Sequence, residues 1–277
     1  MKLSLNRRQS LLLLLILLIF GLVFAWTSSN GQSGDRRIKR IEIKNKGNRG
    51  FVFFTERDVL QILQKKSGKL TGRSHKSVQL QQLEYELIEQ PGIRSADVYV
   101  NLNGTLAVKI QEREPLLLVR NQKGEQFYLD SAGILMPTRG KHAEHALPVN
   151  GRIKTAFKAG AVTQEQSLKD LVQVALIMAA DPFWDAQFEQ GYVDNSGRII
   201  MVPRVGTHSI VLGTAENLTQ KLENLRLFYE KGLKTMGWNR YRTIDLSYQN
   251  QIVGKPLDRE SEQFLLRPVQ NDTHSTP

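Results

Sequence analysis

The strongest constraint on how this chain can fold is an uncharged apolar run, LLLLLILLIFGLVFAW, at positions 11–26. At about 1.5 Å per residue, a helix of this length nearly crosses a ~30 Å hydrocarbon core, and two further residues can extend it. A surface helix of a soluble domain needs a polar face, which this run lacks. We therefore expect a transmembrane helix over residues 11–28, anchored by Leu11, Leu18, Phe24 and, at the interface, Trp26.

The flanking charges predict the orientation of this helix. Lys2, Arg7 and Arg8 precede it, and the first ten residues contain no acidic side chain. Residues 1–10 should therefore stay in the cytoplasm, and everything after the helix should lie outside it. A cleaved signal peptide is the alternative, with Thr27 and Ser29 as the small residues before the cut. The lack of an Ala-x-Ala cleavage site favours a membrane helix that is not cleaved. In both cases the residues after the apolar run lie outside the cytoplasm.

Composition narrows the function of the exported part. The chain has 277 residues, so about 250 lie beyond the apolar run, enough for two domains with cores of their own. With no cysteine, it can form neither a disulfide framework nor a thiolate metal site. Its net charge of +11 suits nucleic acid or an anionic membrane, and an exported chain rarely meets nucleic acid. A polar linker, residues 29–37, leads into a basic cluster expected near lipid headgroups, namely Arg36, Arg37, Lys39 and Arg40.

Residues 38–114 show the pattern β-α-α-β-β. Ile41 and Ile43 alternate with charged residues and predict a strand. Two amphipathic helices follow, and Pro91 and Gly92 end the second. Alternating apolar residues over 96–110 predict a hairpin, for which Asn103 and Gly104 favour a type I′ turn.

Residues 115–256 are rich in predicted strands. Two short strands flank an Asp130–Gly133 turn, and three strands follow later at 188–193, 198–202 and 209–212. One helix should bury Leu168, Leu171, Val172, Ala175, Leu176 and Ala179, and another should bury Leu218, Leu222, Leu225 and Leu233. Two last strands meet at Gln249 and Asn250, and residues 257–277 lack periodicity, as in a flexible tail.

These segments carry a resemblance to a known family. The β-α-α-β-β order, with PGIRSADVYVNLNGTLAVKIQEREP at 91–115, resembles a POTRA module. One such module directly behind one membrane helix, with a β-rich domain after it, is similar to the FtsQ/DivIB family of bacterial division proteins. The stretch SIVLGTAENLTQKLENLRLFYEKGL at 209–233 also resembles that family. The resemblance implies an α+β fold in which helices of the second domain pack on an antiparallel sheet.

The resemblance also implies a function. A protein of this family is a single-pass inner-membrane scaffold of the division site, with its bulk in the periplasm or its extracytoplasmic equivalent. Its partners are FtsB/FtsL-like divisome proteins, and its last strand accepts a segment of FtsB by strand addition, helping to recruit or regulate septal peptidoglycan synthesis. The matching residues here are Tyr248, Gln251, Ile252, Val253, Gly254 and Lys255. A proline at Val253 is then expected to abolish partner binding while the isolated domain stays folded.

Two other classes of protein share features with this sequence. An outer-membrane assembly or secretion factor also uses POTRA modules, but several of them, followed by a membrane barrel for which residues 115–277 are too short and too helical. A wall hydrolase needs paired carboxylates, and Asp181 and Asp185 in DPFWD are better explained by helix capping. His142 and His145 lack a third metal ligand. We predict no enzyme activity, cofactor, metal, small-molecule substrate or nucleic-acid partner.

Overall fold

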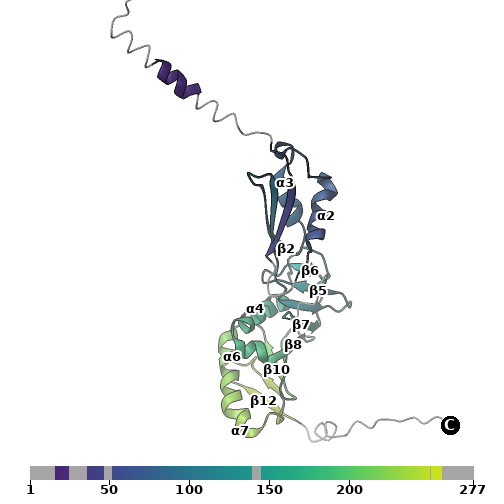
Figure 1. Cartoon of the computed structure of the whole chain (residues 1–277). Helices are drawn as coiled ribbons and strands as arrows, with labels where there is room; N and C mark the ends of the chain where they lie inside the picture. Colours follow the sequence, from purple (N-terminus) through teal and green to yellow (C-terminus); the bar gives the residue numbers. More distant parts are fainter. Residues whose placement is uncertain (1–15, 25–35, 47–51, 139–144, 250, 258–277) are drawn as a thin grey trace, which may run out of the picture. The chain divides into compact units, whose positions relative to one another are not determined.

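The computed structural model describes residues 16–24, 36–46, 52–138, 145–249 and 251–257 (Figure 1). Residues 16–24 are helical, and their side chains are exposed. The other described residues divide into two compact units, and each is described here by itself.

The first unit has the predicted β-α-α-β-β order. Its strands form one sheet in the order β1-β3-β2, with bounds β1 Arg40–Lys46, β2 Ile93–Val100 and β3 Thr105–Glu112. Its helices are α2 Glu56–Ser67, the short 3-10 helix η1 His75–Ser77, and α3 Leu80–Ile88. Val59, Leu63, Leu83 and Leu87 are buried on the apolar faces of α2 and α3. The ends of β1, β2 and β3, with the segments Asn45–Thr55 and Ile88–Ser95, group with the second unit.

The hairpin between β2 and β3 is not the predicted type I′ turn. Gly104 has a φ of 84°, but Asn103 does not have a positive φ. The turn instead spans Asn101 to Gly104, whose N–H donates to the Asn101 carbonyl at 3.0 Å. The Asn103 side chain accepts from the N–H of Thr105 at 3.0 Å, so it stabilises the turn through a side-chain bond.

The second unit contains a nine-stranded sheet in the order β12-β11-β10-β9-β8-β7-β4-β5-β6. The strand bounds are β4 Leu117–Arg120, β5 Gln126–Leu129, β6 Leu135–Pro137, β7 Leu147–Gly151, β8 Phe188–Val193, β9 Ile199–Pro203, β10 Ser209–Gly213, β11 Tyr241–Asp245 and β12 Val253–Pro256. The expectation of an antiparallel sheet is wrong: the sheet is mixed, because β4 and β7, β7 and β8, and β10 and β11 pair in parallel. Parallel neighbours need a crossover connection, which the helices within residues 166–187 supply between β7 and β8, and those within residues 218–236 supply between β10 and β11. The predicted β8-β9-β10 meander is present, with antiparallel pairing.

Helices pack on this sheet (Figure 1) and supply 12 of the 27 buried residues of its main hydrophobic core. They are α4 Gln166–Ala180, α5 Pro182–Gln187, α6 Leu218–Leu227, the π-helix η2 Phe228–Leu233 and α7 Lys234–Met236. The four predicted leucines of α6 and η2 are buried, as expected. On α4 the prediction is wrong for Leu176 and Ala179, which are exposed, while Val174 and Met178 are buried instead.

Candidate functional site

The terminal strand β12 has one side without a described partner strand. It pairs with β11 in antiparallel register, Asp245 opposite Val253 and Thr243 opposite Lys255. In the described part of the chain, no strand pairs with its other side. A strand edge of this kind presents unpaired N–H and C=O groups to which an extended segment can bind.

The register identifies which backbone groups face outward. Pro256 lies opposite Tyr241 but has no N–H, and the next residue, Leu257, donates its N–H to the Arg240 carbonyl at 3.1 Å. Because successive residues of a strand direct their backbone groups to opposite sides, Lys255 and Val253 also face β11. Gly254 therefore directs its N–H and C=O away from the sheet. The expectation that a proline at Val253 leaves the domain intact is therefore wrong, because the N–H of Val253 faces β11 and its loss would weaken the sheet itself. Gly254 is the residue of β12 whose backbone N–H can be blocked without removing a bond to β11.

The opposite edge of the same sheet is already covered. The N–H of Leu135, in β6, donates to the Ala161 carbonyl, and the Leu135 carbonyl accepts from the N–H of Gly160, both at 2.8 Å. The N–H of Thr163 continues this pairing by donating to the Gly133 carbonyl at 2.9 Å. The chain thus covers β6 with its own segment, whereas no described segment does so for β12.

A tyrosine of the neighbouring strand lies against Gly254. A Cβ atom at position 254 would come within 2.5 Å of Cε1 and 2.6 Å of Cδ1 of Tyr241. The Tyr241 ring in turn packs on Phe228, with 5.7 Å between ring centroids. Position 254 must therefore be glycine for the ring to stay where it is, a close approach of the kind that glycine in a strand often marks.

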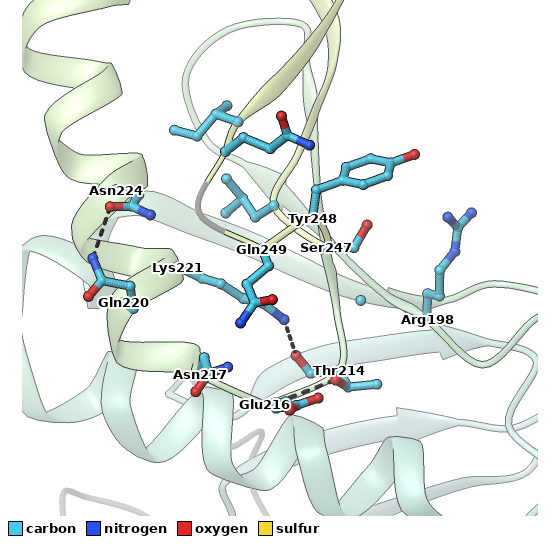
Figure 2. Close-up of a pocket in the computed structure, with 14 residues that line it drawn as sticks. Arg198, Thr214, Glu216, Asn217, Gln220, Lys221, Asn224, Ser247, Tyr248 and Gln249 are labelled. Atoms are coloured by element: carbon cyan, nitrogen blue, oxygen red, sulfur yellow. Dashed lines mark hydrogen bonds between the residues drawn. The ribbon is translucent and has the colours of Figure 1, made fainter.

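A cavity of about 610 Å³ adjoins the connection between β11 and β12 (Figure 2). Its wall includes Leu246 to Gln249, Gln251 and Ile252 from that connection. The facing wall includes Gln220, Lys221 and Asn224 of α6, and Asn217, which directly precedes this helix. Tyr248 is 52% exposed, and in Figure 2 its ring points away from α6. The rim of the cavity therefore includes an exposed aromatic ring.

Two cations in the cavity wall are already bound within the chain. Lys221 donates to the carbonyls of Leu212 at 2.8 Å and Thr214 at 2.9 Å, and burial lowers the pKa of its ammonium group. Arg198 binds Asp194 at 2.9 Å. Burial opposes ionisation of Asp194, but hydrogen bonds from Ser196 and Arg198 lower its pKa to about 2. These contacts fix the wall.

Of the six predicted partner-binding residues, only Val253, Gly254 and Lys255 belong to β12. Tyr248 and Gln251 to Ile252 were expected on the last two strands, but they lie in the connection between β11 and β12. Gln251 and Lys255 are exposed, and Val253 and Gly254 are half-buried. Ile252 is half-buried and packs against the core. The sequence analysis did not identify Tyr241 and Pro256 as part of this site. Gly254 within a short predicted strand was a signal that another group, here the Tyr241 ring, lies close to the backbone.

The candidate catalytic residues have other roles. Asp181 accepts from the N–H of Phe183 at 2.9 Å and caps α5, with Pro182 at its first position, as predicted. It also binds Arg226, which lies over the Phe183 ring at 4.5 Å. Trp184 is buried against Phe188. No three potential metal ligands cluster among the described residues, and His142 lies outside them.

The predicted membrane helix is described only in part. Leu18 and Phe24 belong to the helical residues 16–24 and are 63% and 67% exposed. Leu11 and Trp26 lie outside the described residues. None of the helices in the described ranges is both long and apolar enough to traverse a bilayer.

Comparison with protein families gives two matches. Residues 114–255 match the family model described as FtsQ/DivIB, C-terminal related. Residues 37–111 match the model of a POTRA-like domain. A comparison with curated proteins finds no match. The two family matches occur in the order predicted for a POTRA module followed by a β-rich domain.

Proposed function

Because the chain belongs to the FtsQ/DivIB family, we propose that it is a non-catalytic scaffold of bacterial cell division that captures its partner on strand β12. The family domains support a scaffold role in division. The finer assignment concerns the partner, an FtsB/FtsL-type divisome protein, and the mode of binding, which is addition of an extended segment to the sheet.

The free edge of β12 is the observation that carries this proposal. Exposed sheet edges are usually blocked, because they pair indiscriminately with other chains. Here the β6 edge is covered by residues 160–163, whereas the outward N–H and C=O of Gly254 have no described strand to meet. An edge that is left open at one end of a sheet and covered at the other is suited to receive a partner.

The geometry limits how the partner binds. Gly254 offers one outward donor and acceptor, and the next outward residue, Pro256, offers a carbonyl but no N–H. The added strand must therefore be short. The exposed ring of Tyr248, with the neighbouring cavity, supplies side-chain contact that backbone pairing alone cannot give.

Membrane anchoring adds to this short interface. We propose that residues 11–28 span the bacterial inner membrane once, with the amino end in the cytoplasm and both domains outside. Partners anchored in the same membrane then meet the edge at a raised effective concentration, so a few hydrogen bonds suffice for capture. The expected result is recruitment or regulation of septal peptidoglycan synthesis at midcell.

Photo-crosslinking in cells tests the docking site. A photoreactive phenylalanine is placed at Tyr248 or Lys255 in the full chain, and the attached proteins are identified by mass spectrometry. We expect an FtsB-type protein at both positions. The same residue at Tyr192 is the control, because Tyr192 is 38% exposed but lies on β8, inside the sheet. Equal capture of the partner from Tyr192, or none from Tyr248 and Lys255, would refute the proposed site.

A further inference from the structure

In the first unit, residues 36–40 are held against the loop between α2 and α3. The N–H of Ile38 donates to the Arg73 carbonyl at 2.9 Å, and the N–H of Gly72 donates to the Ile38 carbonyl at 2.7 Å. The N–H of His75 donates to the Arg36 carbonyl at 2.8 Å. Ile38 itself is fully buried, so the segment is fixed to the unit rather than lying loosely on it.

This pairing gathers cations that are far apart in the sequence. The segments 36–40 and 68–77 contain no aspartate or glutamate. Arg36, Arg37, Lys39, Lys69 and Lys76 are exposed, and Arg73 is half-buried. We call these six residues the cationic end: Arg36, Arg37, Lys39, Lys69, Arg73 and Lys76. The sequence alone placed only its first three members together.

The tip of the β2–β3 hairpin lies beside Arg37 and Lys39 of the cationic end. The N–H of Lys39 donates to the Gly104 carbonyl at 2.8 Å, and a Cβ at position 104 would come within 2.8 Å of the Arg37 carbonyl. Leu102, at the tip, is 82% exposed, the highest fraction among the large apolar side chains described. An aliphatic side chain thus projects into solvent beside two segments, 36–40 and 68–77, whose charged residues are all basic.

We propose that the cationic end and Leu102 form a docking surface for a bilayer containing anionic phospholipid. Lysine and arginine bind anionic headgroups, and a neighbouring leucine can enter the boundary between headgroups and acyl chains. This function differs from partner capture at β12. It rests on the expected membrane span at residues 11–28 and on the pairing described above.

The distance from the expected span agrees with this placement. Only residues 29–35 separate Ser28 from Arg36, and an extended chain of this length reaches at most about 28 Å. The cationic end therefore follows the membrane anchor closely enough to touch the surface. An acidic protein is the competing occupant, but Leu102 projects into solvent, 82% exposed, and so offers such a partner no apolar pocket to fill.

The absence of cysteine allows a direct test in the full chain. The Leu102→Cys variant, labelled with an environment-sensitive fluorophore, is reconstituted into lipid nanodiscs of phosphatidylcholine, with or without phosphatidylglycerol. We expect the fluorophore to be shielded from an aqueous quencher in the anionic discs and accessible to it in the neutral discs. Added salt should reverse the shielding, because surface charges are screened beyond about 10 Å at 0.1 M ionic strength.

Two double variants distinguish the loss of cations in the cationic end from the loss of positive charge elsewhere in the first unit. K69Q/K76Q removes two of its exposed cations and should lower the docking equilibrium constant about 30-fold, at about 5-fold per cation. R57Q/K109Q is the matched control and should change the docking equilibrium constant less than 3-fold. Arg57 lies roughly 14 Å or more along α2 from the loop that carries Lys69, and Lys109 lies about as far along β3 from the hairpin tip, so salt screens both from the bilayer.

Several results would overturn the proposal. They are an equally accessible fluorophore in anionic and neutral discs, the same loss in both double variants, or a chain that does not remain with the discs. Shielding by polyglutamate in neutral discs, with none from phosphatidylglycerol, would identify an acidic protein as the occupant instead. Crosslinking at β12 is a separate measurement, so either proposal can fail alone.

Discussion

Replacing Gly254 by alanine should disturb strand β12, the proposed docking edge, because the new Cβ displaces the Tyr241 ring. The new Cβ would meet Tyr241 at 2.5 Å, a distance that real Cβ atoms do not adopt, so the ring must turn away. Overpacking of this kind costs about 1–3 kcal/mol, and loss of the Tyr241–Phe228 contact adds about 0.5–1.5 kcal/mol. We expect the free energy of unfolding to fall by about 2 kcal/mol and partner affinity to fall with it.

A double-mutant cycle isolates the cause. In a Tyr241→Ala background the obstacle is gone, and Gly254→Ala should then be neutral or stabilise the unit by about 0.5 kcal/mol, because alanine restricts the unfolded chain. The assay is urea unfolding of residues 36–277, followed by tryptophan fluorescence, to which Trp238 in this unit contributes. An equal cost of Gly254→Ala in both backgrounds would refute the reasoning.

Two further substitutions test other parts of the second unit. Glu112 is buried and accepts from the N–H groups of Phe53 and Phe54 and from Asn45, so Glu112→Ala should cost about 2–4 kcal/mol in urea unfolding, and a change below 1 kcal/mol would contradict this. Burial lowers the pKa of His208 below its ordinary 6.5, so the folded state favours the neutral imidazole. Relative to a pH above 6.5, the free energy of unfolding should therefore fall as the pH drops through the pKa of the folded state, where His208 must be protonated. His208→Gln should flatten the decline of stability in that acidic range, and an unchanged slope would exclude His208 as its source.

Local patterns predicted the elements of this fold well. The leucines of α6 recur at helical spacing with polar residues between them, so their buried face was identified correctly. The face of α4 was not, because apolar residues surround Leu176 on most sides of the helix and periodicity could not choose among them. The Asn103–Gly104 pair suggested a type I′ turn, but the Asn103 side chain bonds to Thr105 and only the glycine adopts a positive φ.

The geometry of the candidate site depends on contacts between segments that are distant in the sequence. A family resemblance pointed to residues 248–255, but the outward direction of Gly254 depends on its register with β11. The contact between Tyr241 and Gly254 depends on the same register, and the gathering of Lys69 and Lys76 beside Arg36 depends on hydrogen bonds between distant segments. None of these relations follows from periodicity, which reports only neighbours along the chain.

Amide hydrogen exchange at Gly254 tests strand addition most directly. In the free protein its N–H faces outward and should exchange rapidly, whereas those of Val253 and Lys255 face β11 and should be slower. On binding of an FtsB-type partner, the Gly254 amide should become protected by roughly 100-fold or more, because it then donates to the added strand. Unchanged exchange at Gly254 under saturating partner would show that the partner binds elsewhere.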